Sequence, residues 1–289
     1  MHTLRRTHQT HQTRLNKKSY THNKYQKPTK SLCVGILTIP HSSKIQYGTS
    51  HIMKTYVDWF EKRNVSVIPI PFDTVSHKEY FGLVNGLVIP GGETEFIIKN
   101  DIFIKTVVRF IELSLHTKEY FPIWGTCFGF EILVMIIGGI KRLKPYPAHG
   151  FYPISILDNA YTSKMLRNFS PRYLKYLVEQ NSCNNNHEFG ISTKDFMNNK
   201  HLTHFYSILA TSKDENGNEY VALIEAKYYP IYGVQWHPER QKNSSEFINF
   251  FISELAKNKH NCKSYLKINI EAHKCIQYPE HSNVLCYFF

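Results

Sequence analysis

Residues 121–139, with the sequence FPIWGTCFGFEILVMIIGG, constrain the fold more than any other part of the chain. The first letters, FPIWG, are short and apolar and predict a buried strand. FEILVMII, which runs into Gly138 and Gly139, predicts a buried helix that ends at glycine. Between them, GTCFG has the Gly-x-nucleophile-x-Gly spacing of a nucleophile elbow, with Cys127 where serine hydrolases carry serine. The flanking glycines suit a sharp turn from strand to helix, where side chains would clash.

Cys127 is therefore the first candidate for a catalytic residue. The elbow lifts its sulfur out of the sheet and places it beside the first free N–H groups of the helix. That positive end favours the thiolate, which is the nucleophilic form of cysteine. An isolated cysteine is more often a small core residue, but the two glycines and the strand–turn–helix context favour a nucleophile here.

The pattern before the elbow predicts an α/β fold. Strands are expected at 31–40, 65–71 and 85–90, and helices at 47–63 and 101–116. Strands that alternate with helices of this length predict a mostly parallel, doubly wound sheet with helices on both faces. Prolines in 65–71 indicate strand ends or an edge position. Ligands bind at the carboxyl ends of such strands, so the loop after 85–90 and the elbow should meet there.

The second half of the chain is richer in strands. The pattern predicts a short strand at 151–157, helical turns within 161–178, a buried strand at 230–236 and a helix at 244–256 that opens with a serine cap. The segments 206–210 and 220–226 flank the turn DENGN and predict a hairpin.

A cysteine nucleophile needs a base, and His237 is the best candidate because it follows the predicted buried strand directly. Glu239 would point to the same side of an extended chain and could orient the imidazole, as the third member of a triad does. A lone histidine is more often a packing or capping residue, but the cysteine elbow upstream favours a base.

Acyl transfer also needs hydrogen-bond donors for an oxyanion. Gly91 and Gly92 follow a predicted strand, and their bare backbone could approach a substrate closely. The N–H of Phe128, directly after the nucleophile, would be the second donor. Taken alone, the two glycines would indicate an ordinary turn.

The charge of the chain is concentrated in its first residues. The formal net charge is +12, but residues 1–31 hold eight Lys or Arg and no acid, which leaves +4 for the remainder. We therefore expect no nucleic-acid partner for the folded part. Residues 1–31 have almost no aliphatic side chains and are expected to be a disordered basic leader; a transit peptide is the minority alternative.

No apolar run is long enough to cross a bilayer, and the first residues lack the apolar core of a signal peptide. We expect no membrane partner and leave the localisation open. The six cysteines and sixteen histidines show no metal-ligand spacing, so neither a metal nor a cofactor is expected. The sequence divides into the leader (1–31), a catalytic domain (32–258) and a tail of uncertain role (259–289).

Three segments together, WGTCFGFE, NGLVIPGG and YPIYGVQWHPE, resemble the gamma-glutamyl hydrolase family, the folate-polyglutamate peptidases of the class I glutamine-amidotransferase-like superfamily. The resemblance runs from about Leu32 to near Ala256. It implies a flavodoxin-like sheet, Cys127 as nucleophile, His237 as general base and Glu239 as supporting acid. It also implies that His187, within NNNHEFGIS, is an active-site histidine that contacts substrate. Members of the family are usually secreted, lysosomal or vacuolar.

The leading hypothesis is a cysteine peptidase that hydrolyses γ-glutamyl bonds of folyl or other poly-γ-glutamates through a Cys127 thioester. The expected binding partner of such an enzyme is a small-molecule substrate. The sequence leaves open whether the protein forms a homodimer. A glutaminase-type amidotransferase subunit is the alternative enzyme, which would need a synthase for which this chain has no room. A catalytically silent binding protein of the same fold is a further alternative, disfavoured by the intact Cys127, His237 and Glu239.

Overall fold

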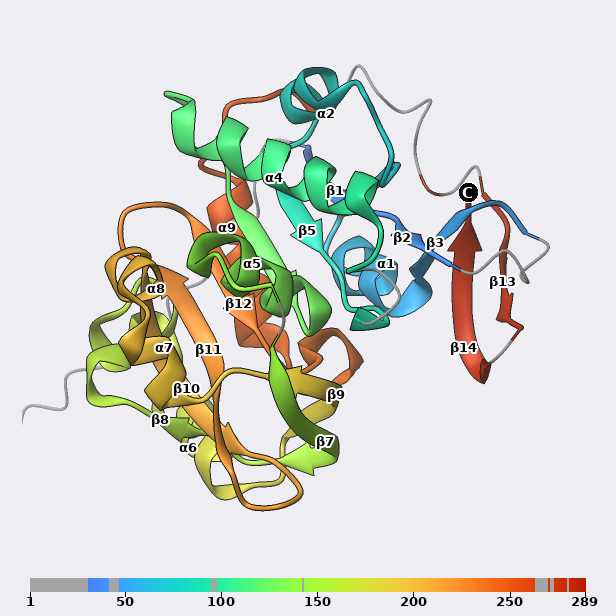
Figure 1. Ribbon diagram of the computed structural model, residues 1–289. Helices are drawn as coiled ribbons and strands as arrows, with labels where there is room; N and C mark the ends of the chain where they lie inside the picture. The colour runs from blue at the N-terminus through green and yellow to red at the C-terminus, as the bar shows by residue number, and fades with distance from the viewer. Residues whose placement is uncertain are drawn as a thin grey trace, which may run out of the picture.

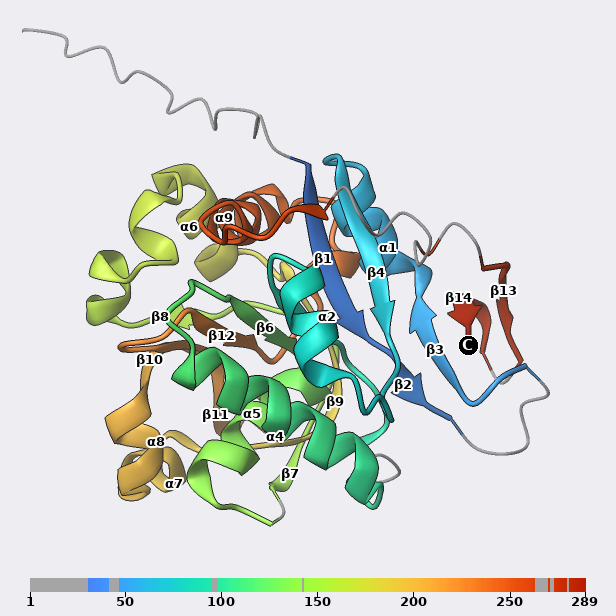
Figure 2. The same cartoon turned by 90° about the horizontal axis from the view of Figure 1, so that it is seen from above.

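The computed structural model describes residues 31–41, 47–94, 98–141, 143–262, 270, 273–279 and 281–289. Of the leader predicted over 1–31, only Ser31 falls within these ranges, so the predicted disorder lies outside the described residues. The fold is built on an eight-stranded sheet whose order is β4-β1-β5-β6-β12-β11-β10-β8. Figures 1 and 2 show this sheet between layers of helices.

Five neighbouring strands of this sheet are parallel and the remaining three are antiparallel, which confirms the prediction of a mostly parallel sheet. The parallel strands are β4 (Val65–Ile70), β1 (Leu32–Leu37), β5 (Leu87–Ile89), β6 (Ile123–Thr126) and β12 (Ile231–Val234). The antiparallel ones are β11 (Glu219–Ala226), β10 (Tyr206–Lys213) and β8 (Ser155–Ile156). The proline-containing β4 lies at the edge, as expected, where a missing N–H does least harm.

Helices cover both faces of the sheet, and on each face an apolar cluster is formed by side chains of the helices and of the sheet. One cluster joins α2 (His77–Leu83), α4 (Asp101–His116), α5 (Phe128–Gly138), α7 (Thr193–Asn198) and α8 (Lys200–Phe205). The other joins α1 (Lys54–Glu61), α6 (Pro171–Glu179) and α9 (Ser245–Leu255). Strand β1 contributes Cys33 and Leu37 to the first cluster and Leu32, Val34 and Ile36 to the second, because its side chains alternate between faces.

Several sequence predictions are confirmed at the level of whole elements. The helix 101–116 is α4, and the elbow joins β6 to α5, which ends with Gly139 in the left-handed conformation. The predicted hairpin is the antiparallel pair β10–β11. Ser244 is at the N-cap position of α9, but its hydroxyl accepts from Trp59 Nε1 at 3.0 Å instead of capping the helix.

The prediction of one helix over 47–63 is wrong in its first part. Residues Ser50–Met53 form strand β3, and the helix α1 starts only at Lys54. β3 pairs with β2 (Ile39–Pro40) and with β14 (His281–Phe288), and β13 (Cys275–Tyr278) completes a four-stranded sheet of order β13-β14-β3-β2. Partners at the far end of the chain therefore decide the conformation of this segment. Figure 1 shows β13 and β14 beside β3.

The segment 144–190 also differs from the prediction. The expected strand at 151–157 is divided at Pro153, which offers no N–H to a ladder: Phe151 and Tyr152 end β7 (Lys144–Tyr152), and β8 follows. β7 pairs with β9 (Cys183–Gly190), a strand that the sequence did not predict because its buried side chains are largely polar. The helical turns expected within 161–178 correspond to the 3-10 helices η1 (Asp158–Thr162) and η2 (Leu166–Asn168) and to α6.

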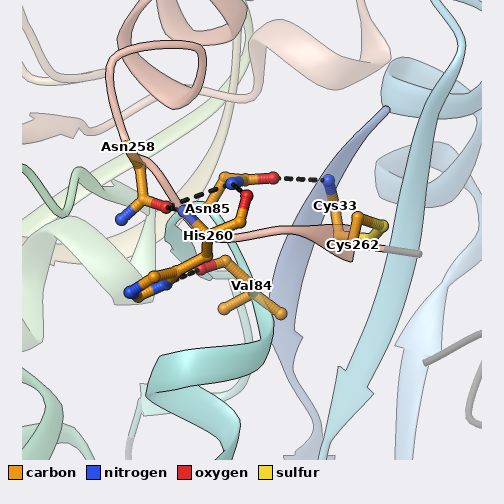
Figure 3. Close-up of a disulfide and its surroundings, with 6 residues drawn as sticks. All are labelled: Cys33, Val84, Asn85, Asn258, His260 and Cys262. Atoms are coloured by element: carbon orange, nitrogen blue, oxygen red, sulfur yellow. Dashed lines mark hydrogen bonds between the residues drawn. A yellow bond between two sulfur atoms is a disulfide. The ribbon is translucent and has the colours of Figure 1, made fainter. Parts of the chain in front are cut away.

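The segment after α9 is joined to the sheet by a disulfide between Cys33 of β1 and Cys262, whose Cα atoms are 5.6 Å apart. Figure 3 shows the buried Asn85 beside it. The side chain of Asn85 accepts from the Cys33 N–H at 2.8 Å and donates to Asn258 Oδ1 and to the His260 carbonyl at 3.1 and 3.0 Å. The start of the tail is thus held against β1 by one covalent bond and several hydrogen bonds.

Candidate active site

The predicted site residues come together at the carboxyl ends of three parallel strands. Gly91 and Gly92 follow β5, Cys127 follows β6, and His237 follows β12. Gly92, Cys127 and His237, with His187, line one cavity of about 690 Å³. The expected meeting of the loop after β5 with the elbow is confirmed, since parallel strands end at the same edge of a sheet.

Cys127 sits in a strained backbone conformation, with φ of 53° and ψ of −111°. The turn is held because its N–H donates to the Val234 carbonyl at 2.8 Å and its carbonyl accepts from Glu131 N–H at 2.9 Å. The flanking glycines are required by close backbone approach. A Cβ at Gly125 would lie 2.4 Å from the Gly129 carbonyl oxygen, and one at Gly129 would lie 1.9 Å from the Ile89 carbonyl oxygen. The elbow therefore excludes side chains at both positions.

The protonation of Cys127 corrects the expectation of a thiolate stabilised by the helix. Burial raises the pKa of the thiol well above its ordinary value, and the neighbouring Glu131 raises it further. The Phe128 N–H and Arg240 lower the pKa, but they do not outweigh burial. The thiol is consequently protonated at neutral pH and donates to the Asn186 carbonyl oxygen, with Sγ 3.6 Å from that atom.

His237 is paired with Glu239, as the triad hypothesis requires. Nδ1 of His237 is 2.7 Å from Glu239 Oε1, and both side chains are buried. The prediction that the chain stays extended from His237 to Glu239 is wrong, however, because Pro238–Arg240 form the 3-10 helix η3. Burial lowers the pKa of His237 even though Glu239 raises it, so the imidazole is neutral and can accept a proton. Its Nε2 makes no hydrogen bond to any described residue.

Gly91 lies between Cys127 and His237. A Cβ there would be 2.8 Å from Cε1 of His237 and 3.2 Å from Cβ of Cys127, so the two functional side chains flank this glycine. Its N–H donates to the Tyr56 hydroxyl oxygen at 2.8 Å and is therefore not free for an oxyanion. This corrects the role expected for the Gly91 amide. Gly92 lines the cavity, and the Phe128 amide lies close enough to Cys127 to lower its pKa.

His187 lies on β9 and lines the same cavity. Its ring packs edge to face on Tyr220, with centroids 5.0 Å apart, and neither ring nitrogen has a hydrogen-bond partner of acceptable geometry among the described residues. Burial, together with His237, lowers the pKa of His187 to about 3, so the imidazole is neutral and carries one N–H.

Glu131 is a site residue that the sequence reasoning missed. It is fully buried in the first turn of α5, and its carboxylate accepts from Thr94 Oγ1 at 2.6 Å and from Gln235 Nε2 at 3.0 Å. It therefore links the nucleophile helix to the loop after β5 and to the strand before His237. Burial raises the pKa of Glu131 to about 7. Its place as the one acid in the apolar run FEILVMII was the available signal.

The sequence reasoning also missed one wall of the cavity. Arg240 and residues of β2, β3 and β14 line it beside the catalytic side chains. Arg240 follows the HPE motif directly and was visible in the sequence. The C-terminal strand was not, because nothing local connects it to β3.

Two features are absent from the described ranges. No group of three or more His, Cys, Asp or Glu side chains among them could hold a metal ion. No helix among them is long and apolar enough to cross a membrane.

Comparisons with known proteins find similarity over most of the chain. The family described as Peptidase C26 matches residues 32–239. Gamma-glutamyl hydrolase B of Dictyostelium discoideum is 34% identical over 254 residues, covering 78% of this chain and 73% of the relative. Gamma-glutamyl hydrolase of Homo sapiens is 30% identical, covering 80% of each chain. A solved structure from Thermoplasma acidophilum, assigned to GMP synthase, has a TM-score of 0.53 at 16% identity. It covers 82% of this chain and 97% of that one, and it shares the fold.

Proposed function

The chain belongs to the peptidase C26 family and is an enzyme of the gamma-glutamyl hydrolase class, a cysteine-type peptidase that cleaves γ-glutamyl bonds. On this premise we propose that Cys127 is the nucleophile, His237 the general base and Glu239 its orienting acid. We further propose that the substrates are small-molecule poly-γ-glutamates, folyl conjugates among them.

One observation carries the assignment of residues. Cys127 occupies a strained elbow, and a Cβ at Gly91 would lie 3.2 Å from Cβ of Cys127 and 2.8 Å from Cε1 of His237. Nδ1 of His237 is bound to the buried Glu239. A nucleophile next to a base that is itself oriented by a carboxylate is the arrangement used for acyl transfer.

The protonation states define the steps of the reaction. His237 Nε2 takes the proton of the Cys127 thiol as the sulfur attacks the side-chain carbonyl of a glutamyl residue. The tetrahedral oxyanion accepts hydrogen bonds from the Phe128 and Gly92 amides. Collapse breaks the C–N bond, and His237 returns the proton to the leaving amine. Water, deprotonated by His237, then attacks the thioester carbonyl. The C–S bond breaks, the imidazolium returns its proton to the sulfur, and the acyl fragment leaves with a free γ-carboxylate.

The choice of a peptide over glutamine follows from the leaving group. Glutamine releases only ammonia, whereas a γ-glutamyl peptide releases a glutamate with carboxylates. A site that binds this anion gains energy that glutamine cannot supply. His187 supports such a site, because its neutral imidazole lines the cavity with one N–H to donate.

The test is a comparison of kcat/KM for γ-glutamyl-glutamate and for glutamine, with wild type, Cys127→Ala and His187→Asn. We expect wild type to prefer the dipeptide, Cys127→Ala to cleave neither substrate, and His187→Asn to lose part of the preference. A preference of the wild type for glutamine would overturn the substrate assignment in favour of a glutaminase. Turnover by Cys127→Ala would overturn the mechanism.

A further inference from the structure

The C-terminal hairpin β13–β14 forms one side of the catalytic cavity. Tyr278 of β13 and Val284 and Cys286 of β14 line the same cavity as Cys127 and His237. The end of the chain is fixed, because the Phe289 N–H donates to the Ser50 carbonyl at 2.9 Å and the Phe289 carbonyl accepts from Thr49 N–H at 2.6 Å. The hairpin is therefore part of the site and not a loose tail.

Arg240 is the one Lys or Arg among the described residues that line this cavity. Its Nε is 3.5 Å from Glu239 Oε1, an oxygen that already accepts the shorter bond from His237, and its Nη2 is 3.3 Å from the sulfur of Met53. Thioether sulfur is a weak acceptor. The guanidinium thus keeps donors for a stronger anionic partner.

His51 lines the same cavity as this guanidinium. It is two residues from Met53 on β3, so both side chains point to the same face of the strand, and both line the cavity. The ring packs against Tyr278 of the hairpin, with centroids 4.9 Å apart, and its buried Nδ1 has no partner among the described residues. Burial and the nearby His41 lower the pKa of His51 to about 4, so the ring is a neutral donor.

A guanidinium and an imidazole N–H on one wall suit a carboxylate. Two acids also line the cavity, Glu93 and Glu188, and Glu188 is 3.0 Å from Nε2 of His149.

In a γ-glutamyl peptide, the α-carboxylate of the leaving residue is attached to the carbon that bears the scissile nitrogen. His237 must protonate that nitrogen, so this carboxylate has to lie near His237. Arg240 comes three residues after His237 and contacts its partner Glu239.

We propose that Arg240 and His51, backed by the C-terminal hairpin, bind the α-carboxylate of the leaving glutamate. The inference rests on the proposed function and adds the residues that select the leaving side. It assigns strands β13 and β14 to substrate recognition, with Asn283 on the cavity wall where further carboxylates of a longer chain would pass.

The experiment uses the full chain and two dipeptides that differ in one group: γ-glutamyl-glutamate and the same compound with the leaving residue's α-carboxylate replaced by a carboxamide. We expect wild type to favour the carboxylate by about tenfold or more, the range of a charge-assisted hydrogen bond. In Arg240→Gln this ratio should fall close to one, and Arg240→Lys should keep part of it. Arg109→Gln, which removes an exposed charge on α4 outside the cavity lining, is the matched control and should keep the ratio.

His51→Phe tests the imidazole separately, because phenylalanine keeps an aromatic ring against Tyr278 but has no N–H to donate. We expect a several-fold loss of the same ratio. Asn283→Glu adds a negative charge to the lining and should slow the carboxylate substrate selectively, whereas Gln277→Glu adds it to the hairpin outside the lining and should not.

The use of a ratio separates recognition from catalysis, since Arg240 also acts on the pKa values of Cys127 and His237. If Arg240→Gln slows both substrates by one factor, Arg240 tunes the catalytic pair only and the subsite is wrong. If wild type cleaves both dipeptides equally well, the subsite is wrong and the hydrolase assignment stands. If wild type cleaves neither while glutamine is hydrolysed, the proposed function itself is wrong. Should Arg240→Gln fail to fold, the same substrate ratio measured in Arg240→Lys and His51→Phe tests the subsite.

Discussion

In the proposed mechanism, Cys127 and His237 meet the substrate as a neutral thiol and a neutral imidazole. Burial raises the pKa of the thiol and lowers the pKa of the imidazole, since each charged form loses solvation. The proton must therefore move as the sulfur attacks, and the orienting bond from Glu239 stabilises the imidazolium that forms. This arrangement keeps a reactive thiolate from accumulating while no substrate is bound.

The same residues show what a sequence can predict at this scale. Cys127, His237 and Glu239 belong to short motifs in which chemistry and local backbone are encoded together, so their pairing could be predicted. The bond between the Gly91 N–H and Tyr56 could not, because it joins segments that only the folded sheet brings together. Glu131 was equally hidden, since its partners Thr94 and Gln235 come from two other segments.

Glu131 provides a test of pH dependence at the scale of one residue. The folded-state pKa of about 7 lies above the ordinary 4.5. Between these values the folded chain holds a proton that the unfolded chain releases, so stability falls as pH rises through this window. Above pH 7 the carboxylate charge also disfavours the thiolate of Cys127.

We predict that Glu131→Gln will reduce the fall in melting temperature between pH 5 and pH 8. The amide can still hydrogen-bond to Thr94 and Gln235 but carries no charge. The ratio of kcat/KM of the variant to that of wild type should also rise as pH passes through 7, because only wild type then gains a charge that disfavours negative charge on the attacking sulfur. Glu112→Gln, at an exposed position on α4, is the control. Profiles that run parallel in wild type and Glu131→Gln would show that the charge has no such influence.

At the scale of elements, local pattern predicts the structure wherever neighbours in sequence are neighbours in space. The helix α4, the elbow and the hairpin β10–β11 are of this kind. In Ser50–Met53 the local pattern favours a helix, because Ile52 and Tyr56 fall at helical spacing. Pairing with β2 and β14 overrides that spacing, and a strand position depends on partners that a local pattern does not contain.

The packing of α5 on the sheet yields a prediction for the elbow. An alanine at position 129 would place its Cβ 1.9 Å from the Ile89 carbonyl oxygen, which is strand backbone and cannot move aside easily. We expect Gly129→Ala to lower the free energy of unfolding by about 3 kcal/mol or more, at the upper end for overpacking. Gly82→Ala in α2 is the matched control. A Cβ there meets no atom within 4 Å, and alanine should raise helix stability by up to about 1 kcal/mol.

Denaturant unfolding of both variants against wild type measures these changes. Equal effects of the two substitutions would mean that the contact with Ile89 does not decide the residue at position 129, and that the elbow tolerates a side chain there.

At the scale of the whole molecule, the last part of the described chain closes the fold against its first strand. The segment after α9 returns to β1 before the hairpin reaches the site. The disulfide Cys33–Cys262 and the hydrogen bonds of Asn85 hold the start of this return (Figure 3), and Phe289 holds its end. No local pattern indicates this closure, because the paired cysteines are separated by 229 positions.

This closure leads to a prediction for reducing conditions. A crosslink over so long a separation limits the unfolded chain far more than the folded one, so its loss should cost about 2–4 kcal/mol. For a chain of this size we expect the melting temperature to fall by roughly 5–12 °C on reduction. Cys33→Ala/Cys262→Ala should melt at the reduced wild-type temperature and be insensitive to the reductant. Activity at 25 °C should persist in both forms, because Asn85 still binds Asn258 and His260, and Phe289 still binds Ser50. Calorimetry with and without reductant, with thiols counted in each sample, measures this. An unchanged melting temperature in a sample shown to be fully reduced would mean that the hydrogen bonds alone close the molecule.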